Sequence, residues 1–576
     1  MSGRNSLCLR VSATLCKIFG MTKTIFVQIV TMKHLLILFL FLPCFVFAQN
    51  KKTSKLERPK LVVGLVVDQM RWDFLYRYHH RYKKEGGFRR MMDQGFSFEN
   101  TFIPYTPTVT GCGHATIYTG TVPAIHGITG NSWWDNLKGR QVNCVEDKSV
   151  KTIGGILSTG EMSPKNMLTT SITDELKLTT NFRSKVIGIA LKDRGSILPA
   201  GHSADAAYWY ESKSGRFISS GFYMDSLPTW VNNFNEAKWT DQYYQQGWGL
   251  IDNPVTYVQS ASDLQSYEAR PFGKDQIGFP YDLKRFIGKD YDAVLKTPHG
   301  NALTLSFAKN AIEAEQLGKD SIPDFLAISF SSPDYIGHAF GPNSMEVEDM
   351  YVRLDRELGD FFEYLDQKVG KGQYLCFLSA DHGVAHVPGF LQEKKVPAGL
   401  VDDRRIMDTL NFMLDQQYHC GNMILHVNNY QIGLNHLKID SLDLDEDKII
   451  DKMINYIKGV DGIDRVFELS ELMEEPLPAK LHESIANGYH PQRSGDIQMI
   501  FRSGWIDGGN TGTTHGLWNP YDSHIPLLWY GWKIPQGSTT EEVYMTDIAA
   551  TVAALLKIQM PGGCIGKSLI PFMDYR

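Results

Sequence analysis

Residues 60–68 read KLVVGLVVD, an almost unbroken apolar run that ends in an acid. Valines dominate this run, and so short and apolar a segment is typical of a strand that is buried on both faces of a parallel sheet. Similar runs recur along the chain, at Lys185–Leu191, Asp324–Phe330, Gln373–Leu378, Ile497–Phe501 and Ile525–Tyr530. We expect these runs to be strands of one sheet.

Helical patterns lie between the apolar runs. In Glu346–Gln367, apolar residues recur at three- and four-residue steps, which predicts an amphipathic helix. Asn343 is its expected N-cap, with Glu346 three residues further on, and Thr546–Ile558 predicts another helix. Strands that alternate with helices indicate an α/β fold with a mostly parallel central sheet and helices on both faces. In such sheets ligands bind at the carboxyl ends of the strands.

Two regions interrupt this alternation. Residues 204–300 are rich in Trp, Tyr, Asn, Asp and Gly, and residues 388–495 mix short apolar runs with charged stretches. We expect both regions to be insertions that cap the sheet, within one catalytic domain that spans residues 59–576.

The N-terminus has the features of an export signal. Leu35–Ala48 (LLILFLFLPCFVFA) is an apolar run of about 14 residues behind a basic start, with a small residue at a plausible cleavage point. That run is short for a membrane span, although an uncleaved anchor and a lipoprotein signal at Cys44 are alternatives. We expect residues 1–48 to be a leader (with Met32 a possible true start) and residues 49–58 a linker. The mature protein would then be periplasmic or secreted, with no stable membrane span.

The charge of the chain excludes one large class of partner. Lys and Arg number 58 and Asp and Glu 64, a net charge of −6. Removing residues 1–48 takes away five basic residues and no acids, which leaves 53 basic and 64 acidic residues and a net charge of −11. A nucleic-acid-binding partner is not expected, because such proteins usually need a basic face. An anionic ligand would need a local binding site, because long-range attraction is disfavoured.

Carboxylate and imidazole side chains stand at or close after the ends of the predicted strands. These residues are Asp68, Asp334, His338, Asp381 and His382, and His515 in the segment GTTHG joins the set although it does not directly follow a predicted strand. Carboxylate oxygen and imidazole nitrogen suit Zn²⁺, and six such ligands are enough for two ions. Each feature alone has a plainer explanation as a helix surface, a turn or a helix cap. Their meeting at one edge of one sheet favours a metal site.

The segment TVTGCGHAT at residues 108–116 is a candidate nucleophile site. Its two glycines permit a tight turn just before a helix start at Ala115–Tyr118. The N-terminus of a helix favours anions, and coordination to Zn²⁺ can ionise a hydroxyl such as that of Thr110. The alternative is that Thr110 only caps the helix.

Lys192-Asp193-Arg194 directly follows the Lys185–Leu191 run. At a strand end, Lys and Arg can hold the non-bridging oxygens of a phosphate, Arg through paired hydrogen bonds. A solvated charge cluster is the alternative interpretation.

Taken together and in this order, the motifs resemble those of the alkaline phosphatase superfamily. The similar branch holds type I phosphodiesterases, nucleotide pyrophosphatases and threonine-nucleophile bacterial alkaline phosphatases, and the resemblance runs from about Lys60 to Leu569. It implies two zinc ions. One would be bound by Asp334, His338 and His515, and the other by Asp68, Asp381, His382 and the nucleophile Thr110.

The resemblance also implies how the substrate is held. Asn131, in the segment GITGN, matches the asparagine that hydrogen-bonds a phosphoryl oxygen in this branch. Lys192 and Arg194 match the pair that marks monoesterases, and Lys192 stands where other alkaline phosphatases place Mg²⁺, so no third metal is expected. The implied protein is an exported zinc-dependent phosphomonoesterase that acts on small-molecule phosphate esters through a phosphothreonine.

Other functions compete with this one. A phosphodiesterase or nucleotide pyrophosphatase would share the fold, and a metal-stabilised envelope binding protein would keep the ligands without turnover. A sulfatase needs a Cys-x-Pro-x-Arg type of site, whereas Cys112 is followed by Gly113 and His114. A serine hydrolase needs Gly-x-Ser-x-Gly, which the chain lacks.

Overall fold

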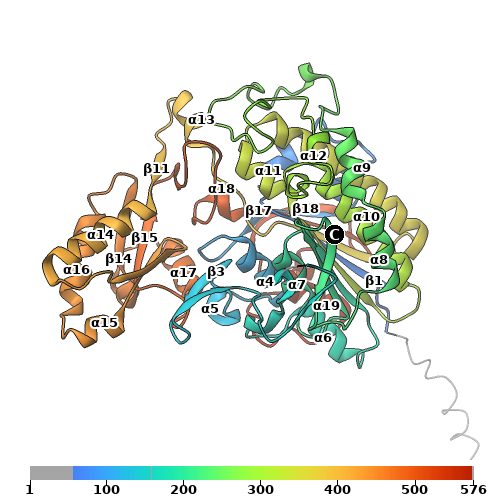
Figure 1. The fold of residues 1–576 in the computed structure, drawn as a ribbon. Coiled ribbons are helices and arrows are strands. Elements are labelled where there is room, and N and C mark those ends of the chain that lie inside the picture. Colours follow the sequence, from blue (N-terminus) through green and yellow to red (C-terminus); the bar gives the residue numbers. More distant parts are fainter. Residues whose placement is uncertain (1–55, 157, 574–576) are drawn as a thin grey trace, which may run out of the picture. The chain divides into compact units, whose positions relative to one another are not determined.

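A ten-stranded sheet organises the protein (Figure 1). The computed structural model describes residues 56–156 and 158–573, so the expected leader and most of the expected linker lie outside the described residues. The strand order is β18-β2-β17-β10-β1-β9-β6-β7-β8-β5. The bounds are β1 Leu61–Val67, β2 Phe96–Phe102, β5 Thr152–Ile153, β6 Val186–Ala190, β7 Ala206–Glu211, β8 Arg216–Ser220, β9 Asp324–Phe330, β10 Tyr374–Ser379, β17 His524–Gly531 and β18 Gly537–Tyr544.

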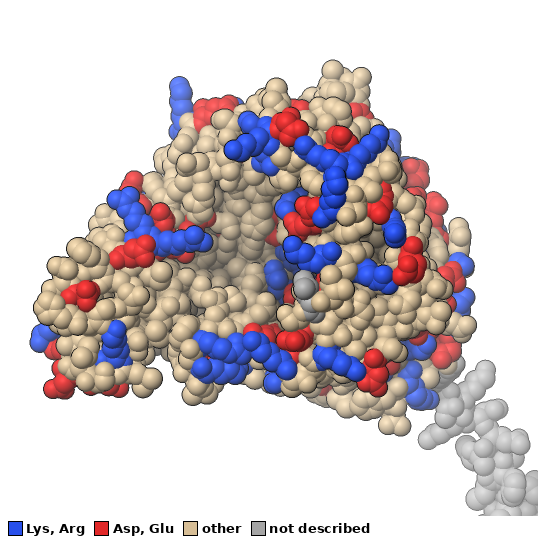
Figure 2. Space-filling model, viewed as in Figure 1, with Lys and Arg blue, Asp and Glu red and all other residues tan. Residues whose placement is uncertain are grey.

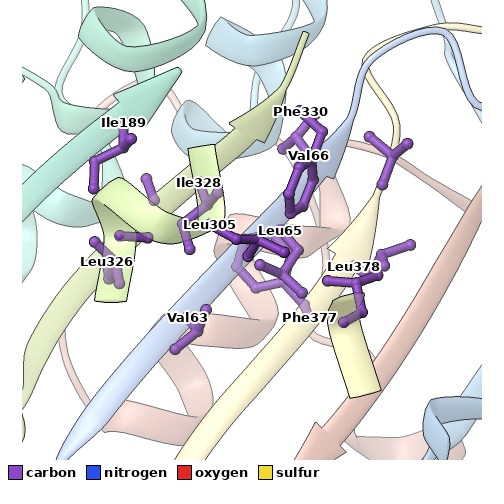
Figure 3. Close-up of a cluster of buried hydrophobic side chains, with 14 of the residues drawn as sticks. Val63, Leu65, Val66, Ile189, Leu305, Leu326, Ile328, Phe330, Phe377 and Leu378 are labelled. Atoms are coloured by element: carbon purple, nitrogen blue, oxygen red, sulfur yellow. The ribbon is translucent and has the colours of Figure 1, made fainter. Parts of the chain in front are cut away.

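The middle of this sheet is parallel. β1 lies between β9 and β10 and runs parallel to both, and β6 continues in parallel beyond β9. All seven residues of β1 are buried, as expected for a strand with helices on both faces. Figure 3 shows Leu305 from a covering helix lying over the strands near Leu65 and Ile328. The predicted α/β fold with a mostly parallel sheet is confirmed.

Helices cover both faces of the sheet, and Figure 1 shows α10, α11 and α12 on one side and α4, α7 and α19 on the other. The helices of this part are α2 Phe74–Arg77, α3 Gly87–Gln94, α4 Thr110–Thr119, α5 Pro123–His126, α6 Ile172–Thr179, α7 Asp193–Ala200, α8 Thr229–Glu236, α9 Trp239–Gln246, α10 His299–Glu315, α11 Ser332–Phe340, α12 Met345–Leu365, α18 Pro520–Ser523, α19 Asp547–Leu556 and α20 Ile570–Met573. A two-stranded hairpin, β3 Ser132–Asp135 and β4 Arg140–Asn143, follows α5. In the described parts of the chain, no helix is both long enough and apolar enough to cross a membrane.

The N-cap predicted for α12 is wrong by one residue. Ser344 is the N-cap, and its hydroxyl oxygen accepts a hydrogen bond from the backbone N–H of Val347 at 3.2 Å. Asn343 is engaged elsewhere, because its Oδ1 lies 2.6 Å from Nδ1 of His386. A serine next to an asparagine offers two candidate caps, and the tertiary contact of the asparagine selects the serine.

The run Ile497–Phe501 is a strand, but it does not belong to the central sheet. As β15 it pairs antiparallel with β13 and β14 in a separate four-stranded sheet of order β12-β13-β15-β14. It is buried because helices of the surrounding segment, residues 388–507, supply a second hydrophobic core. The segment contains α13 Pro388–Glu393, β11 Gly399–Val401, α14 Asp403–Tyr418, β12 Ile424–Asn428, β13 Gln431–Leu434, α15 His436–Ser441, α16 Glu446–Ile457, β14 Ile463–Glu468, α17 Ala479–Gly488, β15 Ile497–Phe501 and β16 Trp505–Asp507.

The region 204–300 begins inside the central sheet. β7 pairs in parallel with β6, and β8 pairs antiparallel with β7, so both extend the sheet. Every residue of β7 is buried, although its composition (AAYWYE) is less apolar than that of the central strands. The irregular part of this region therefore starts after residue 220.

Candidate active site

The parallel strands bring the predicted site residues to one edge of the sheet. Asp68 directly follows β1, and Lys192 follows β6 by two residues. Asp334 lies in the first turn of α11, just after β9, and Asp381 and His382 follow β10. Because β1, β6, β9 and β10 point the same way, their carboxyl ends meet at this edge.

Asp334, His338 and His515 form one group of possible metal ligands, with one donor atom of each within 4.8 Å of the others. Nε2 of His338 lies 3.1 Å from Oδ1 of Asp334, and Nε2 of His515 lies 3.5 Å from the same oxygen. Nδ1 of each histidine lies 2.8 Å from a backbone carbonyl oxygen, that of Thr513 and that of Thr108, respectively. These contacts orient both rings with Nε2 toward the carboxylate, the usual arrangement of ligating histidines.

A second group consists of Asp68, Asp334 and His382, so Asp334 lies between the two groups. Nε2 of His382 is 3.5 Å from Oδ1 of Asp68 and 3.6 Å from Oδ2 of Asp381. Within the described residues, Oδ1 of Asp68 is buried and accepts no hydrogen bond, and Oδ2 of Asp381 is buried with Nδ1 of His114 3.2 Å away but outside hydrogen-bond geometry. Such oxygens need a cationic partner, and the donor set of carboxylates and imidazoles fits a metal such as zinc.

The protonation states of three candidate ligands suit metal binding, whereas burial raises the pKa of Asp68 well above its usual range and the carboxylate of Asp334 raises the pKa of His338 against the effect of burial. Burial lowers the pKa of His382 to about 3 and also lowers the pKa of His515, so both imidazoles are neutral near pH 7. Burial alone would raise the pKa of Asp334, but His338 and Lys192 hold it well below its usual range. A metal ligand must be a neutral imidazole or an ionised carboxylate, and these three residues are in that form.

Thr110 is the first residue of α4 and lies among the predicted ligands. The N-cap position belongs to Val109, and no side chain caps this helix, so the simple capping alternative for Thr110 is wrong. Oγ1 of Thr110 lies 3.4 Å from Nε2 of His382 and 3.3 Å from Nζ of Lys192. At Gly113 an added Cβ would lie only 2.3 Å from the carbonyl oxygen of Asp381, so the glycine allows α4 to approach this loop closely.

Three further predicted residues, Asn131, Lys192 and Arg194, bring polar side chains to this part of the protein. Oδ1 of Asn131 accepts a hydrogen bond from the backbone N–H of Gly111 at 2.8 Å, which leaves its amide nitrogen for another partner. Nζ of Lys192 lies 2.7 Å from Asp68 and 2.6 Å from Asp334, and Nε of Arg194 is buried without a hydrogen-bond partner among the described residues. The arrangement offers donors to an anion placed next to the hydroxyl.

Figure 2 shows a hollow on this face of the protein, among α11, α18 and β3, whose visible walls carry few charged residues. The net charge of the chain is also negative. Positive charge for an anionic substrate is therefore supplied locally, by Lys192, by Arg194 and by any bound metal.

Two residues that contact the predicted metal ligands were not predicted from the sequence. Gln69 donates its backbone N–H to Oδ1 of Asp381 at 3.1 Å and its side-chain Nε2 to Oδ1 of Asp334 at 2.7 Å. Nδ1 of the buried His114 lies 3.2 Å from Oδ2 of Asp381 and 2.9 Å from the carbonyl oxygen of Thr110. The spacing of His114, four residues after Thr110 on one helix, was the available signal; Gln69 had none beyond its place next to Asp68.

Buried neutral histidines predict a pH-dependent stability. Burial lowers the pKa of His126, His382 and His386 to about 3 each, whereas an unfolded histidine titrates near pH 6.5. Below about pH 6.5 the unfolded chain therefore binds more protons, and stability falls as the pH falls toward 3. For the metal-free protein each such histidine should cost about 2 kcal/mol between pH 7 and pH 5.

Urea unfolding at the two pH values measures this loss. His126→Gln should lose about 2 kcal/mol less than the native protein over that interval, because it lacks one of the three groups. Equal losses of unfolding free energy in the native protein and in His126→Gln would contradict the lowered pKa of His126.

Comparison with known proteins defines the class of this fold and site. Residues 62–522 match the family model described as type I phosphodiesterase / nucleotide pyrophosphatase, and the chain belongs to this family. Among its relatives, alkaline phosphatase PhoV of Synechococcus elongatus is 50% identical over 512 residues, 88% of this chain and 92% of the relative. Alkaline phosphatase PafA of Elizabethkingia meningoseptica is 46% identical over 526 residues, 90% of this chain and 95% of the relative.

Two further matches are a solved structure and a relative with a different name. The crystal structure of wild-type PafA superposes with a TM-score of 0.87 and covers 90% of this chain and 99% of its own. A protein of Myroides odoratus that is named a calcium-transporting ATPase is 50% identical over 528 residues, 91% of this chain and 96% of the relative.

Proposed function

We propose that this protein is an exported, zinc-dependent alkaline phosphatase that hydrolyses phosphate monoesters through a phosphothreonine. The observation that carries the proposal is the position of Lys192, whose ammonium group lies 3.3 Å from the hydroxyl of Thr110 and contacts Asp68 and Asp334. A terminal phosphoryl group has one more charged oxygen than a diester, and a lysine and an arginine beside the nucleophile suit that extra charge. The similarity to PhoV and PafA supports the same activity.

The proposed metal ligands are the first group described above and a second set in which Asp381 and Thr110 join Asp68 and His382. Asp334, His338 and His515 would hold one zinc ion, and Asp68, Asp381, His382 and Thr110 the other. When bound, the ions would ionise the hydroxyl and stabilise negative charge on the attacking and leaving oxygens. Gln69 and His114 keep the carboxylates of Asp334 and Asp381 in place.

The side chains account for the rest of the reaction. Oγ1 of Thr110 attacks phosphorus in line with the leaving alcohol, and the P–O bond to the alcohol breaks as the bond to Thr110 forms. Water then hydrolyses the phosphothreonine, which regenerates the hydroxyl and releases phosphate. The amide nitrogen of Asn131 and the cations of Lys192 and Arg194 would bind the non-bridging oxygens in both steps. A known PafA variant is altered at one threonine, one asparagine, one lysine and one arginine, the same four residue types.

The second candidate is hydrolysis of a phosphodiester or of ATP. The family model covers diesterases and pyrophosphatases, and one relative bears an ATPase name. A diester has one charged oxygen fewer than a monoester to face Lys192 and Arg194, which is why the monoester is preferred here. Export is proposed from the apolar segment Leu35–Ala48 and its basic start.

Metal removal and restoration test the proposed function. We expect dialysis against a chelator to abolish release of phosphate from an aryl phosphate monoester, by at least about 10³-fold, and stoichiometric zinc to restore it. ATP serves as a parallel substrate. Protein that contains zinc but turns over none of these esters would support the binding-protein alternative instead.

A further inference from the structure

A two-residue turn of the segment 388–507 reaches both sides of the candidate site. Asn429 and Tyr430 alone join β12 to β13, and both have left-handed φ angles, 55° and 63°. Two such residues form the tight turn whose twist matches paired strands. The carbonyl oxygen of Tyr430 also accepts hydrogen bonds from the backbone N–H of Met499 at 2.9 Å and from Nε2 of Gln498 at 3.1 Å. The turn is therefore fixed to the four-stranded sheet.

Tyr430 holds the backbone that carries His515. Its hydroxyl donates a hydrogen bond to the carbonyl oxygen of His515 at 2.9 Å. Its ring packs so closely on the next residue that a Cβ at Gly516 would lie 2.7 Å from the ring. The ring of Phe501 meets it edge-on with centroids 5.0 Å apart, which orients the hydroxyl.

Asn429 holds the loop that carries Asn131. Its side-chain Nδ2 donates to the carbonyl oxygen of Ser132, the residue after Asn131, at 3.2 Å. A Cβ at Gly130 would lie 2.4 Å from the same nitrogen, so the side chain lies against the loop. Arg493, from the same segment, donates to the carbonyl oxygen of Gly127 at the start of that loop.

We propose that Asn429 and Tyr430 are positioning residues that set Asn131 and His515 relative to each other. One rigid turn bonds to the loop of the proposed phosphate ligand and to the loop of the proposed metal ligand, so it fixes the separation of the two. The inference rests on the proposed function, because that function assigns the roles of Asn131 and His515. Both residues act through backbone carbonyl oxygens, those of Ser132 and His515, which is why their proposed role is positioning.

Two single substitutions should separate the two contacts. Tyr430→Phe removes only the hydroxyl, and we expect zinc affinity, measured by competition with a chelator, to fall about 10-fold at one of two sites. Inhibition of the zinc-saturated variant by inorganic phosphate should not change. Asn429→Asp keeps the shape and tolerates the left-handed backbone. It should raise the inhibition constant of inorganic phosphate about 5-fold, with zinc affinity unchanged.

The control is Tyr456→Phe, which removes a tyrosine hydroxyl from α16, where the ring packs against the core of the same segment. Its zinc affinity and phosphate inhibition should equal those of the native protein. The proposal is overturned if Tyr430→Phe and Asn429→Asp leave both quantities unchanged, or if each changes both quantities equally, as general loosening would. If the native protein shows no zinc-dependent turnover, the proposed function fails. If the native protein turns over substrate but the variants behave as the native protein does, only the positioning proposal fails.

Discussion

Thr110→Ala should lower kcat for an aryl phosphate monoester by at least about 10⁴-fold, the loss typical of removing a covalent nucleophile. The hydroxyl of Thr110 lies between His382 and Lys192, 3.4 Å and 3.3 Å from their nitrogens, at the start of α4. The alanine variant lacks this oxygen and would have to use water directly for the attack on phosphorus. Steady-state kinetics with a direct assay of released phosphate measures the loss.

The matched control for this prediction is Thr110→Ser, which keeps the hydroxyl. It should retain activity within about 100-fold of the native enzyme, since the same oxygen remains available. Zinc content must be measured for both variants, because loss of metal would also abolish activity. Near-native turnover by zinc-loaded Thr110→Ala would remove Thr110 as the nucleophile.

The double substitution Lys192→Ala/Arg194→Ala should lower kcat/KM for the monoester by about 10³-fold or more. Lys192 is buried between Asp68 and Asp334, and these carboxylates raise its pKa above the usual value, so its charge persists at alkaline pH. Both cations are proposed to bind phosphoryl oxygens that become more negative as the reaction proceeds. Their loss should affect a methyl diester much less, because it has one charged oxygen fewer.

Metal content again provides the control. Lys192 contacts Asp68 and Asp334, which are proposed metal ligands, so the double variant should be assayed at saturating zinc. Equal losses for monoester and diester would mean that the two side chains support the site in general and do not select the monoester.

The ends of the parallel strands made this site predictable from sequence. Runs such as residues 60–68 and 324–330 were apolar enough to be recognised as buried strands, and the polar residue after each run had to lie at the common edge. The proposed role of Asn131 and the selection of monoesters by Lys192 and Arg194 came from the resemblance, whereas phosphate binding by that pair followed from its place at a strand end. The hydrogen bond from the backbone N–H of Gly111 orients the side-chain amide of Asn131.

Contacts between segments far apart in sequence were not predictable. Ile497–Phe501 is as apolar as a central strand, and only the second core reveals that it belongs to another sheet. The N-cap of α12 depended on a contact between Asn343 and His386. Gln69, Asn429 and Tyr430 make a few hydrogen bonds to distant segments, and such contacts leave no periodic or compositional pattern in a sequence.

Whether the native protein selects monoesters over diesters is decided by one ratio of kinetic constants. An aryl phosphate monoester and the methyl diester of the same aryl phosphate share the leaving group, so the ratio of their kcat/KM values isolates the extra charge of the terminal phosphoryl group. For the zinc-loaded native enzyme we expect the monoester value to exceed the diester value by about 10³-fold or more. A native preference for the diester would contradict this expectation and assign the site to a phosphodiesterase.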